Sequence, residues 1–207
     1  VLPDNELSNL LLIKRSVKEQ WEIDNMISAQ RIAEKAFVNI LNYIKAGVTE
    51  KQVALELDYM MQKLGSEGVS FETIAVSGKN SALPHGVPTD KKLNNGDFFT
   101  LDFGAVYNGY HSDMTRTVAI GYATDEMEAV YNLVLSAQTA ALNKIASGVK
   151  CKAVDAAARE IITHAGFAGN FGHSTGHGVG LQIHEYPAVS VRNDKELIEN
   201  QIITCEP

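Results

Sequence analysis

The sequence is poor in cysteine, has no excess of basic residues and contains no long apolar run. Cys151 and Cys205 are the only cysteines among 207 residues, too few for a disulfide framework, which favours the reducing cytoplasm. Acidic residues outnumber basic ones by 25 to 18, so the electrostatic footprint of a nucleic-acid-binding protein is missing. No apolar segment approaches the roughly 20 residues that span a membrane. We therefore expect neither nucleic acid nor a membrane as a partner.

The order of sequence patterns is typical of an α+β protein. Apolar residues at helical spacing predict helices over 16–47 and 49–64, the first beginning with a capping box of Ser16 and Glu19. The other predicted elements are strands over 71–76, 98–106, 114–120 and 202–205, and helices over 125–146 and 154–165. These elements divide into two similar halves, each with two helices followed by strands. Such an order predicts helices that cover one face of a sheet.

The most informative stretch is built around Asn108-Gly109. This dipeptide is the strongest short signal for a hairpin and predicts a two-residue type I′ turn. Asp113 then faces Gly104, which leaves room beside the Asp113 carboxylate. Asp102 becomes the diagonal neighbour of Asp113 on the same face of the hairpin.

Two acidic side chains on one face of a buried hairpin repel each other and lose hydration. One divalent metal ion, or a pair of them, would neutralise Asp102 and Asp113. Two other interpretations fit the hairpin alone. One aspartate is exposed while the other caps a turn, or the two act as the acid and base of a glycosidase.

A second polar cluster occupies the glycine-rich segment 171–187. His173, His177 and His184 lie among glycines that let the backbone pass close to a ligand or a metal ion. A lone histidine is more often an ordinary polar side chain, but three of them beside two facing aspartates favour metal binding. Such ligands suit Mn²⁺, Fe²⁺ or Co²⁺, and also Zn²⁺. Glu206 follows an apolar run and either reaches solvent or points into the same site.

Four short motifs together resemble the pita-bread metallopeptidases, which include methionine aminopeptidase, aminopeptidase P and prolidase. The motifs are 101–104 (LDFG), 110–117 (YHSDMTRT), 173–180 (HSTGHGVG) and 204–207 (TCEP). The segment 80–86 (NSALPHG) is similar to the Xaa-Pro branch, since methionine aminopeptidase usually has Cys-His-Gly there. The resemblance implies the α+β pita-bread (creatinase/aminopeptidase) fold. In that fold, pseudo-twofold-related helix pairs pack on a curved, mainly antiparallel sheet.

The resemblance also implies a site for two divalent metal ions, with Mn²⁺ expected and Co²⁺, Zn²⁺ or Fe²⁺ as alternatives. At the matching positions, Asp102 would bind one ion and Asp113 would bridge both. His177 and Glu206 would bind the other ion. The family's fifth ligand, a bridging glutamate, lies on a strand beyond Pro207, so the C-terminal strands of the sheet are expected to be missing.

The activity implied by the resemblance is hydrolysis of the Xaa-Pro bond of dipeptides or of peptide N-termini. A hydroxide that bridges the metal ions would attack the carbonyl before proline. His85 and His184 would be catalytic residues that contact the substrate carbonyl or the leaving nitrogen, and His173 would shape the proline pocket. For His85, capping of the turn after Pro84 is the plainer interpretation.

Two alternative functions remain open at this stage. One is methionine aminopeptidase. The other is a catalytically inactive pita-bread protein that serves as a binding module. Such proteins usually have substituted ligand positions, whereas the four matching positions here all carry residues that can bind a metal ion. The intact ligands also disfavour a creatinase-like amidinohydrolase, which uses no metal.

The motifs also suggest how the chain is organised. We expect residues 16–207 to form the catalytic domain, incomplete at its C-terminus, and residues 1–15 to be the remnant of a linker from an absent N-terminal domain. In this family that domain often mediates dimerisation, so a homodimer is expected for the full-length protein. With four of the five ligands, the fragment itself is expected to bind one metal ion weakly or none, and to lack activity.

Overall fold

The computed structural model describes residues 5–207, and the chain divides into two units, each with its own hydrophobic core. The first unit covers residues 24–128. The second combines residues 129–207 with the N-terminal segment that ends at Ile23. Within the described residues, every helix is too short or too polar to cross a lipid bilayer.

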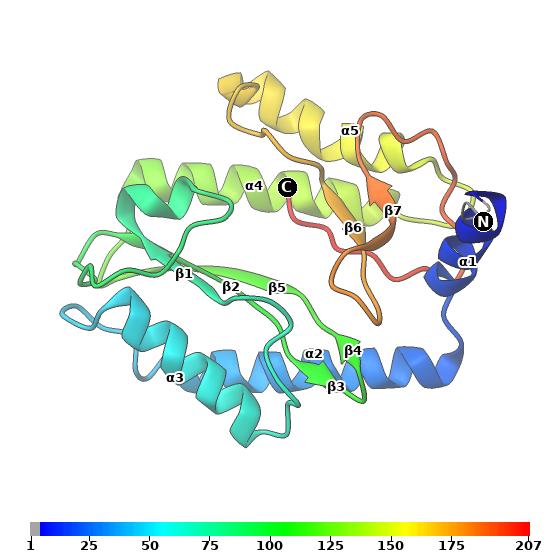
Figure 1. Cartoon of the computed structure of the whole chain (residues 1–207). Helices are drawn as coiled ribbons and strands as arrows, with labels where there is room; N and C mark the ends of the chain where they lie inside the picture. The colour runs from blue at the N-terminus through cyan, green and yellow to red at the C-terminus, as the bar shows by residue number, and fades with distance from the viewer. Residues whose placement is uncertain (1–4) are drawn as a thin grey trace. The chain divides into compact units, whose positions relative to one another are not determined.

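The first unit packs two helices against one face of a three-stranded antiparallel sheet (Figure 1). Its elements are most of α2 (Gln20–Ile40), α3 (Glu50–Lys63), β1 (Ile74–Ser77), the 3₁₀ helix η1 (Gly78–Ala82), β2 (Phe98–Phe103), β3 (Val106–Tyr107), β4 (Tyr110–His111) and β5 (Met114–Ala119). The sheet order is β1-β2-β5, and β3 pairs only with β4 among the described strands. Buried residues recur every three or four positions from Met26 to Ile40, so one stripe of α2 faces the core.

The second unit surrounds a smaller core with helices and a two-stranded antiparallel ladder. Its elements are α1 (Asn5–Ser16), most of α4 (Asp125–Lys144), α5 (Cys151–Ile162), the π-helical turn η2 (Thr163–Phe167), β6 (Gly176–Gly178) and β7 (Glu185–Val189). Ala137 of α4, Val154 and Ala158 of α5, and Val189 of β7 are fully buried in this core.

The two units contain the same hydrogen-bonded entry into a helix. The amide of Gly47 donates to the carbonyl of Leu93 at 2.9 Å, and the amide of Gly148 donates to the carbonyl of Leu197 at 2.8 Å. Helices α3 and α5 begin three residues after these glycines. The two similar halves predicted from the sequence therefore share a local backbone arrangement.

The predicted helix over 16–47 is wrong at its start. Ser16 ends α1 and its hydroxyl donates to the carbonyl of Ile13 at 2.7 Å, so it does not cap a following helix. The entry into α2 uses a different pair, in which the amide of Glu19 donates to the carboxylate of Glu22 at 2.8 Å. A capping interaction therefore exists three residues later than predicted.

The other boundaries follow the sequence more closely. The capping box of Thr49 and Gln52 at the start of α3 is confirmed. The end of the predicted helix over 16–47 is also wrong, because α2 ends at Ile40, seven residues before Gly47, and turns occupy the interval. Of the predicted linker remnant 1–15, residues 1–4 lie outside the described residues and the rest belongs to α1. Its role as a linker stays a prediction.

Candidate metal site and histidine loops

The hairpin that carries the two aspartates has the predicted turn and register. Asn108 and Gly109 have φ of 48° and 76°, as a type I′ turn requires. Tyr107 pairs with Tyr110 beside the turn, and Asp102 pairs with Thr115 further along the ladder. Asp102 is half-buried on the face opposite the buried residues Phe99, Leu101 and Phe103.

The surroundings of Gly104 differ from the prediction. A Cβ atom on Gly104 would lie 1.9 Å from the carbonyl oxygen of Ser112 and 2.7 Å from Cβ of Ser70. The space beside Gly104 is thus filled by these two serines, and the expected room beside Asp113 is wrong. The ladder is interrupted here because the Ser112 hydroxyl accepts a hydrogen bond from the amide of Ala105 at 2.9 Å. Since strict alternation stops at this point, the shared face of Asp102 and Asp113 stays a prediction.

The loop that carries His85 is closed by one buried carboxylate. Oε1 of Glu50 accepts hydrogen bonds from the amide and the hydroxyl of Ser77, both at 2.8 Å. Oε2 accepts from the amide of Thr89 at 3.0 Å and from its hydroxyl at 2.7 Å. Ser77 and Thr89 are the two ends of the loop, and His85 is exposed between them. Glu50 therefore fixes the base of the loop and leaves His85 accessible.

No pattern in the sequence indicates that the Glu50 carboxylate joins the two ends of the His85 loop. Glu50 is the first residue of α3, where an acidic side chain is common because it interacts favourably with the helix dipole. Burial alone would raise the pKa of Glu50, but hydrogen bonds from Thr89 and Ser77 lower it below its ordinary value. The carboxylate is therefore held in its charged form.

His177 and Glu206 form a close pair within the second unit. Nε2 of His177 lies 3.3 Å from Oε1 of Glu206, and both side chains are half-buried. Nδ1 of His177 lies 2.9 Å from the carbonyl oxygen of Gly178, which can only accept a hydrogen bond. Nδ1 therefore carries the proton in the neutral ring, and Nε2 presents a lone pair toward the carboxylate.

This arrangement fits a bound cation. A lone pair on Nε2 and a carboxylate oxygen repel each other unless a proton or a metal ion lies between them. Burial alone would raise the pKa of Glu206, but a hydrogen bond from His177 when its ring is protonated, the hydrogen bond from Thr204, and the positive charge of protonated His177 and His173 lower it. A neutral imidazole whose other nitrogen is fixed by a carbonyl is the usual form of a metal-binding histidine.

Thr204 links the two members of this pair. Its hydroxyl donates to Oε1 of Glu206 at 2.7 Å and accepts from the amide of His177 at 3.0 Å. The predicted strand over 202–205 is present only as backbone hydrogen bonds to β6 and its neighbours, with the Thr204 amide 2.8 Å from the His177 carbonyl oxygen. Burial and the charge of Glu206 raise the pKa of Cys205 to about 11, so this thiol stays protonated. A protonated thiol is a poor nucleophile.

The glycines of the loop serve backbone packing more than ligand approach. A Cβ atom on Gly176 would lie 2.1 Å from the Thr204 carbonyl oxygen, and one on Gly178 would lie 2.2 Å from that of Tyr186. Gly172, by contrast, has open space around it. The two crowded glycines let a strand pass on each side of β6, which places residue 206 beside His177.

The other two histidines of this unit differ in their surroundings. The ring of His184 lies edge-on to that of His177, with 4.3 Å between the ring centres. Its neighbour Glu185 is held by Lys18 at 2.9 Å and Arg15 at 2.7 Å. The exposed ring of His173 packs edge-on against Phe171, 5.0 Å away. His184 is therefore part of the His177 cluster, whereas the ring contact of His173 is with Phe171.

The candidate ligands are thus distributed over two units. Asp102 and Asp113 belong to the first unit, and His177 and Glu206 belong to the second. The histidine–glutamate pair and the hairpin register agree with the sequence analysis. That all four residues bind the same ions stays a prediction.

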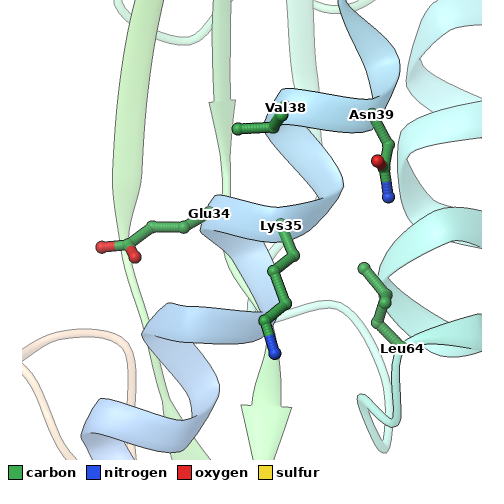
Figure 2. A pocket seen from close by; sticks show the side chains of 5 residues that line it. All are labelled: Glu34, Lys35, Val38, Asn39 and Leu64. Atoms are coloured by element: carbon green, nitrogen blue, oxygen red, sulfur yellow. The ribbon is translucent and has the colours of Figure 1, made fainter.

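A groove on the first unit lies between α2 and α3 (Figure 2). It has a volume of about 480 Å³ and is lined by Glu34, Lys35, Val38, Asn39 and Leu64. None of the seven predicted site residues lines it. The groove is therefore separate from the candidate metal ligands and from the histidine loops.

Comparison with known proteins agrees with the motifs. The sequence pattern of metallopeptidase family M24 matches residues 24–207. The chain belongs to this family. Family M24 enzymes use divalent metal ions, and their pita-bread fold is that of this chain, as the sequence predicted.

Individual M24 relatives are similar over nearly the whole chain. The Xaa-Pro dipeptidase of Pyrococcus furiosus is 42% identical over 193 residues, which cover 93% of this chain and 56% of that protein. The structure of X-Pro aminopeptidase from Thermotoga maritima is 46% identical in sequence with a TM-score of 0.92, and the match covers 94% of this chain and 55% of the aminopeptidase chain. The structure of the Xaa-Pro dipeptidase from Bacillus anthracis is 45% identical with a TM-score of 0.94, and the match covers 96% of this chain and 56% of the dipeptidase chain. The chain spans about half the length of these relatives.

Proposed function

We propose that the full-length protein is a metal-dependent exopeptidase that hydrolyses the Xaa-Pro bond of dipeptides or of peptide N-termini. Its metal ligands in this chain are Asp102, Asp113, His177 and Glu206, which would hold two divalent ions, with Mn²⁺ as the preferred metal. The observation that carries the proposal is the His177–Glu206 pair, in which the Nε2 lone pair faces a carboxylate oxygen at 3.3 Å. The names of the relatives support the Xaa-Pro specificity.

Each candidate residue of this chain would have its own role in the proposed reaction. When bound, divalent ions would make water more acidic and polarise the peptide carbonyl. Asp102 and Asp113 supply negative charge from the hairpin, while Thr204 keeps the Glu206 carboxylate beside His177. His184 lies next to His177 and would donate a hydrogen bond to the substrate carbonyl or the leaving nitrogen. His85 would donate a similar hydrogen bond from the loop whose ends are joined by Glu50. The exposed His173 would contact the proline ring.

Methionine aminopeptidase activity and binding without catalysis are the competing functions. A comparison of Ala-Pro with Met-Ala as substrates distinguishes the proposed Xaa-Pro activity from methionine aminopeptidase activity, because we expect only Ala-Pro to be cleaved. A protein that binds divalent ions but cleaves neither dipeptide, nor an Ala-Pro-Ala tripeptide, would be a binding module. The pair of carboxylates alone would also suit a glycosidase, but that function leaves His177 and Glu206 unexplained.

Replacement of Asp113 tests the metal-dependent mechanism. In the full-length protein, we expect Asp113→Asn to lower kcat/KM for Ala-Pro at least about 100-fold, because loss of a ligand costs at least as much as loss of a ligand's hydrogen-bonding partner. Asp90→Asn is the matched control, since Asp90 is highly exposed and pairs only with Lys51 among the described residues. Metal content by elemental analysis should fall in the first variant and stay constant in the second. Full activity of Asp113→Asn, or of wild type in excess chelator, would contradict the proposal.

We further propose that the full-length protein is a cytoplasmic homodimer. Both cysteines are free in the structure, which supports a reducing compartment. The dimer follows from the resemblance alone, and light scattering of the purified protein measures the mass directly. A monomer would remove this part of the proposal without affecting the metal site.

A further inference from the structure

The loop that carries His173 and His177 is held from one side by an ion pair on α5. Asp155 is fully buried, and Arg159 lies one helical turn further on. Nε of Arg159 is 2.7 Å from Oδ2 of Asp155, and Nη2 is 3.0 Å from Oδ1. This two-point geometry depends on the planar guanidinium, and a lysine ammonium does not reproduce it. We call these two residues the α5 ion pair.

Both members of the α5 ion pair also bind the loop. Nη1 of Arg159 donates to the carbonyl of Phe171 and Nη2 donates to that of His173, each at 2.7 Å. The guanidinium carbon lies 3.9 Å from the centre of the Phe171 ring, close enough for a cation–π interaction. Oδ1 of Asp155 accepts from the amide of Thr175 at 3.1 Å and from its hydroxyl at 3.0 Å. Three alternate residues of the loop are thus fixed.

The fixed loop is in direct contact with the candidate metal ligands. The carbonyl of Thr175 accepts a hydrogen bond from the amide of Glu206 at 2.8 Å, and His177 follows two residues later. We propose that Asp155 and Arg159 are positioning residues, which set the separation of His177 and Glu206 and thereby the affinity for metal. The inference rests on the proposed function, because it assigns His177 and Glu206 as ligands.

The energetics favour positioning over a purely stabilising role. The Asp155 carboxylate is fully buried and 25% of the Arg159 side chain is exposed. Such a pair contributes little net stability, since the loss of hydration offsets much of the attraction between its charges. In the described part of the chain, the hydrogen bonds that leave α5 from this pair all end on residues 171, 173 and 175. What the pair determines is therefore the path of the loop.

Titration of the metal-free full-length protein with Mn²⁺ tests the inference. We expect Arg159→Lys and Asp155→Asn to raise the Kd for Mn²⁺ about 10–100-fold, the usual effect of removing a residue that orients a metal ligand. Glu160→Gln, an exposed change on the same helix, should leave Kd unchanged. Val154→Ala, a core change in the same helix, should lower Tm without changing Kd. Equal Kd values for Arg159→Lys, Asp155→Asn and wild type would overturn the positioning role.

A second measurement needs no metal. In the metal-free protein, we expect amide hydrogen exchange in 171–177 and 204–207 to be at least about 10-fold faster in Arg159→Lys than in Val154→Ala, because local opening is governed by local contacts. Thr175→Val, which removes a single hydroxyl, serves if the charge variants fail to fold. Unchanged exchange in these segments would overturn the inference. A wild-type protein that binds no Mn²⁺ would instead overturn the proposed function, while the exchange data still decide the positioning role.

Discussion

At the scale of single residues, a buried carboxylate supports each of the two loops that carry candidate histidines. Glu50 joins the ends of the His85 loop, and Asp155 holds the loop that leads to His177. Neither residue stands out in the sequence, because the loop residues that donate hydrogen bonds to these carboxylates are 20 to 39 positions away. The motif residues were visible because their chemistry is unusual, whereas these supports look like ordinary helix residues.

Glu50 makes stability depend on pH. Its pKa is lowered in the folded state, so its contribution is fully present above the ordinary glutamate pKa of 4.5 and is lost as the pH falls through the lower, folded-state pKa. At pH 7, we expect Glu50→Gln to reduce the free energy of unfolding by about 2–4 kcal/mol, because hydrogen bonds to a buried charge are lost. Urea unfolding of the full-length protein at several pH values measures both effects.

The matched control for Glu50→Gln is Glu72→Gln, an exposed change in the same unit. It should change stability by no more than about 0.5 kcal/mol. If the difference between wild type and Glu50→Gln stayed constant from pH 7 to pH 3, the lowered pKa of Glu50 would be disproved. A smaller difference in acid is the expected result, since protonation removes the same charge from wild type.

At the scale of elements, the sequence predicted those features that depend on neighbouring residues. The turn at Asn108-Gly109 and the capping box of Thr49 and Gln52 are local, and both are confirmed. Strand β7 was not predicted, and the strand over 202–205 was predicted but is only a set of backbone bonds to β6 and its neighbours. Both depend on β6, a three-residue strand whose partners come from later parts of the chain. Local patterns carry no information about such partners.

Gly176 is the position where this element is most sensitive. A methyl group there would collide with the Thr204 carbonyl, so we expect Gly176→Ala to destabilise the second unit by about 3 kcal/mol and to weaken Mn²⁺ binding. Gly172→Ala is the control, because it lies in the same loop with open space around it. Thermal unfolding and Mn²⁺ titration of the two variants measure the difference. Equal behaviour would mean that residues 204–206 do not pass beside β6 as described.

At the scale of the whole molecule, the sequence placed the four candidate ligands in one set, whereas each unit by itself holds two of them. Family membership and the fold were accessible from the four motifs, since the family that they resemble agrees with the match to metallopeptidase family M24 over residues 24–207. In the sequence, only the order of helices and strands indicated that the chain divides into two units with separate cores. Tertiary packing decides which charged side chains lie together, and the spacing of residues in the sequence does not predict it.

Metal binding should therefore affect both units of the full-length protein. If ligands from both units hold the same ions, Mn²⁺ at 100 times its Kd stabilises the native state by about 2.7 kcal/mol. We expect amide exchange to slow in 98–117 and in 171–206 together, and a chelator to reverse the change. Asp113→Asn should show neither effect. Protection confined to one of the two segments would contradict a shared site.

The repeated helix entry extends to the turn at the other end of each helix. Gly47 and Gly148 are 101 positions apart, and so are Gly65, which follows α3 with φ of 104°, and Gly166, which lies in η2 after α5 with φ of 90°. A constant offset of 101 positions over a helix and both of its flanking turns means that the two units repeat one backbone pattern. The hairpin supplies the two aspartates from the first unit, while the histidine and the glutamate come from the second, so the two units share a backbone pattern but not their candidate ligands.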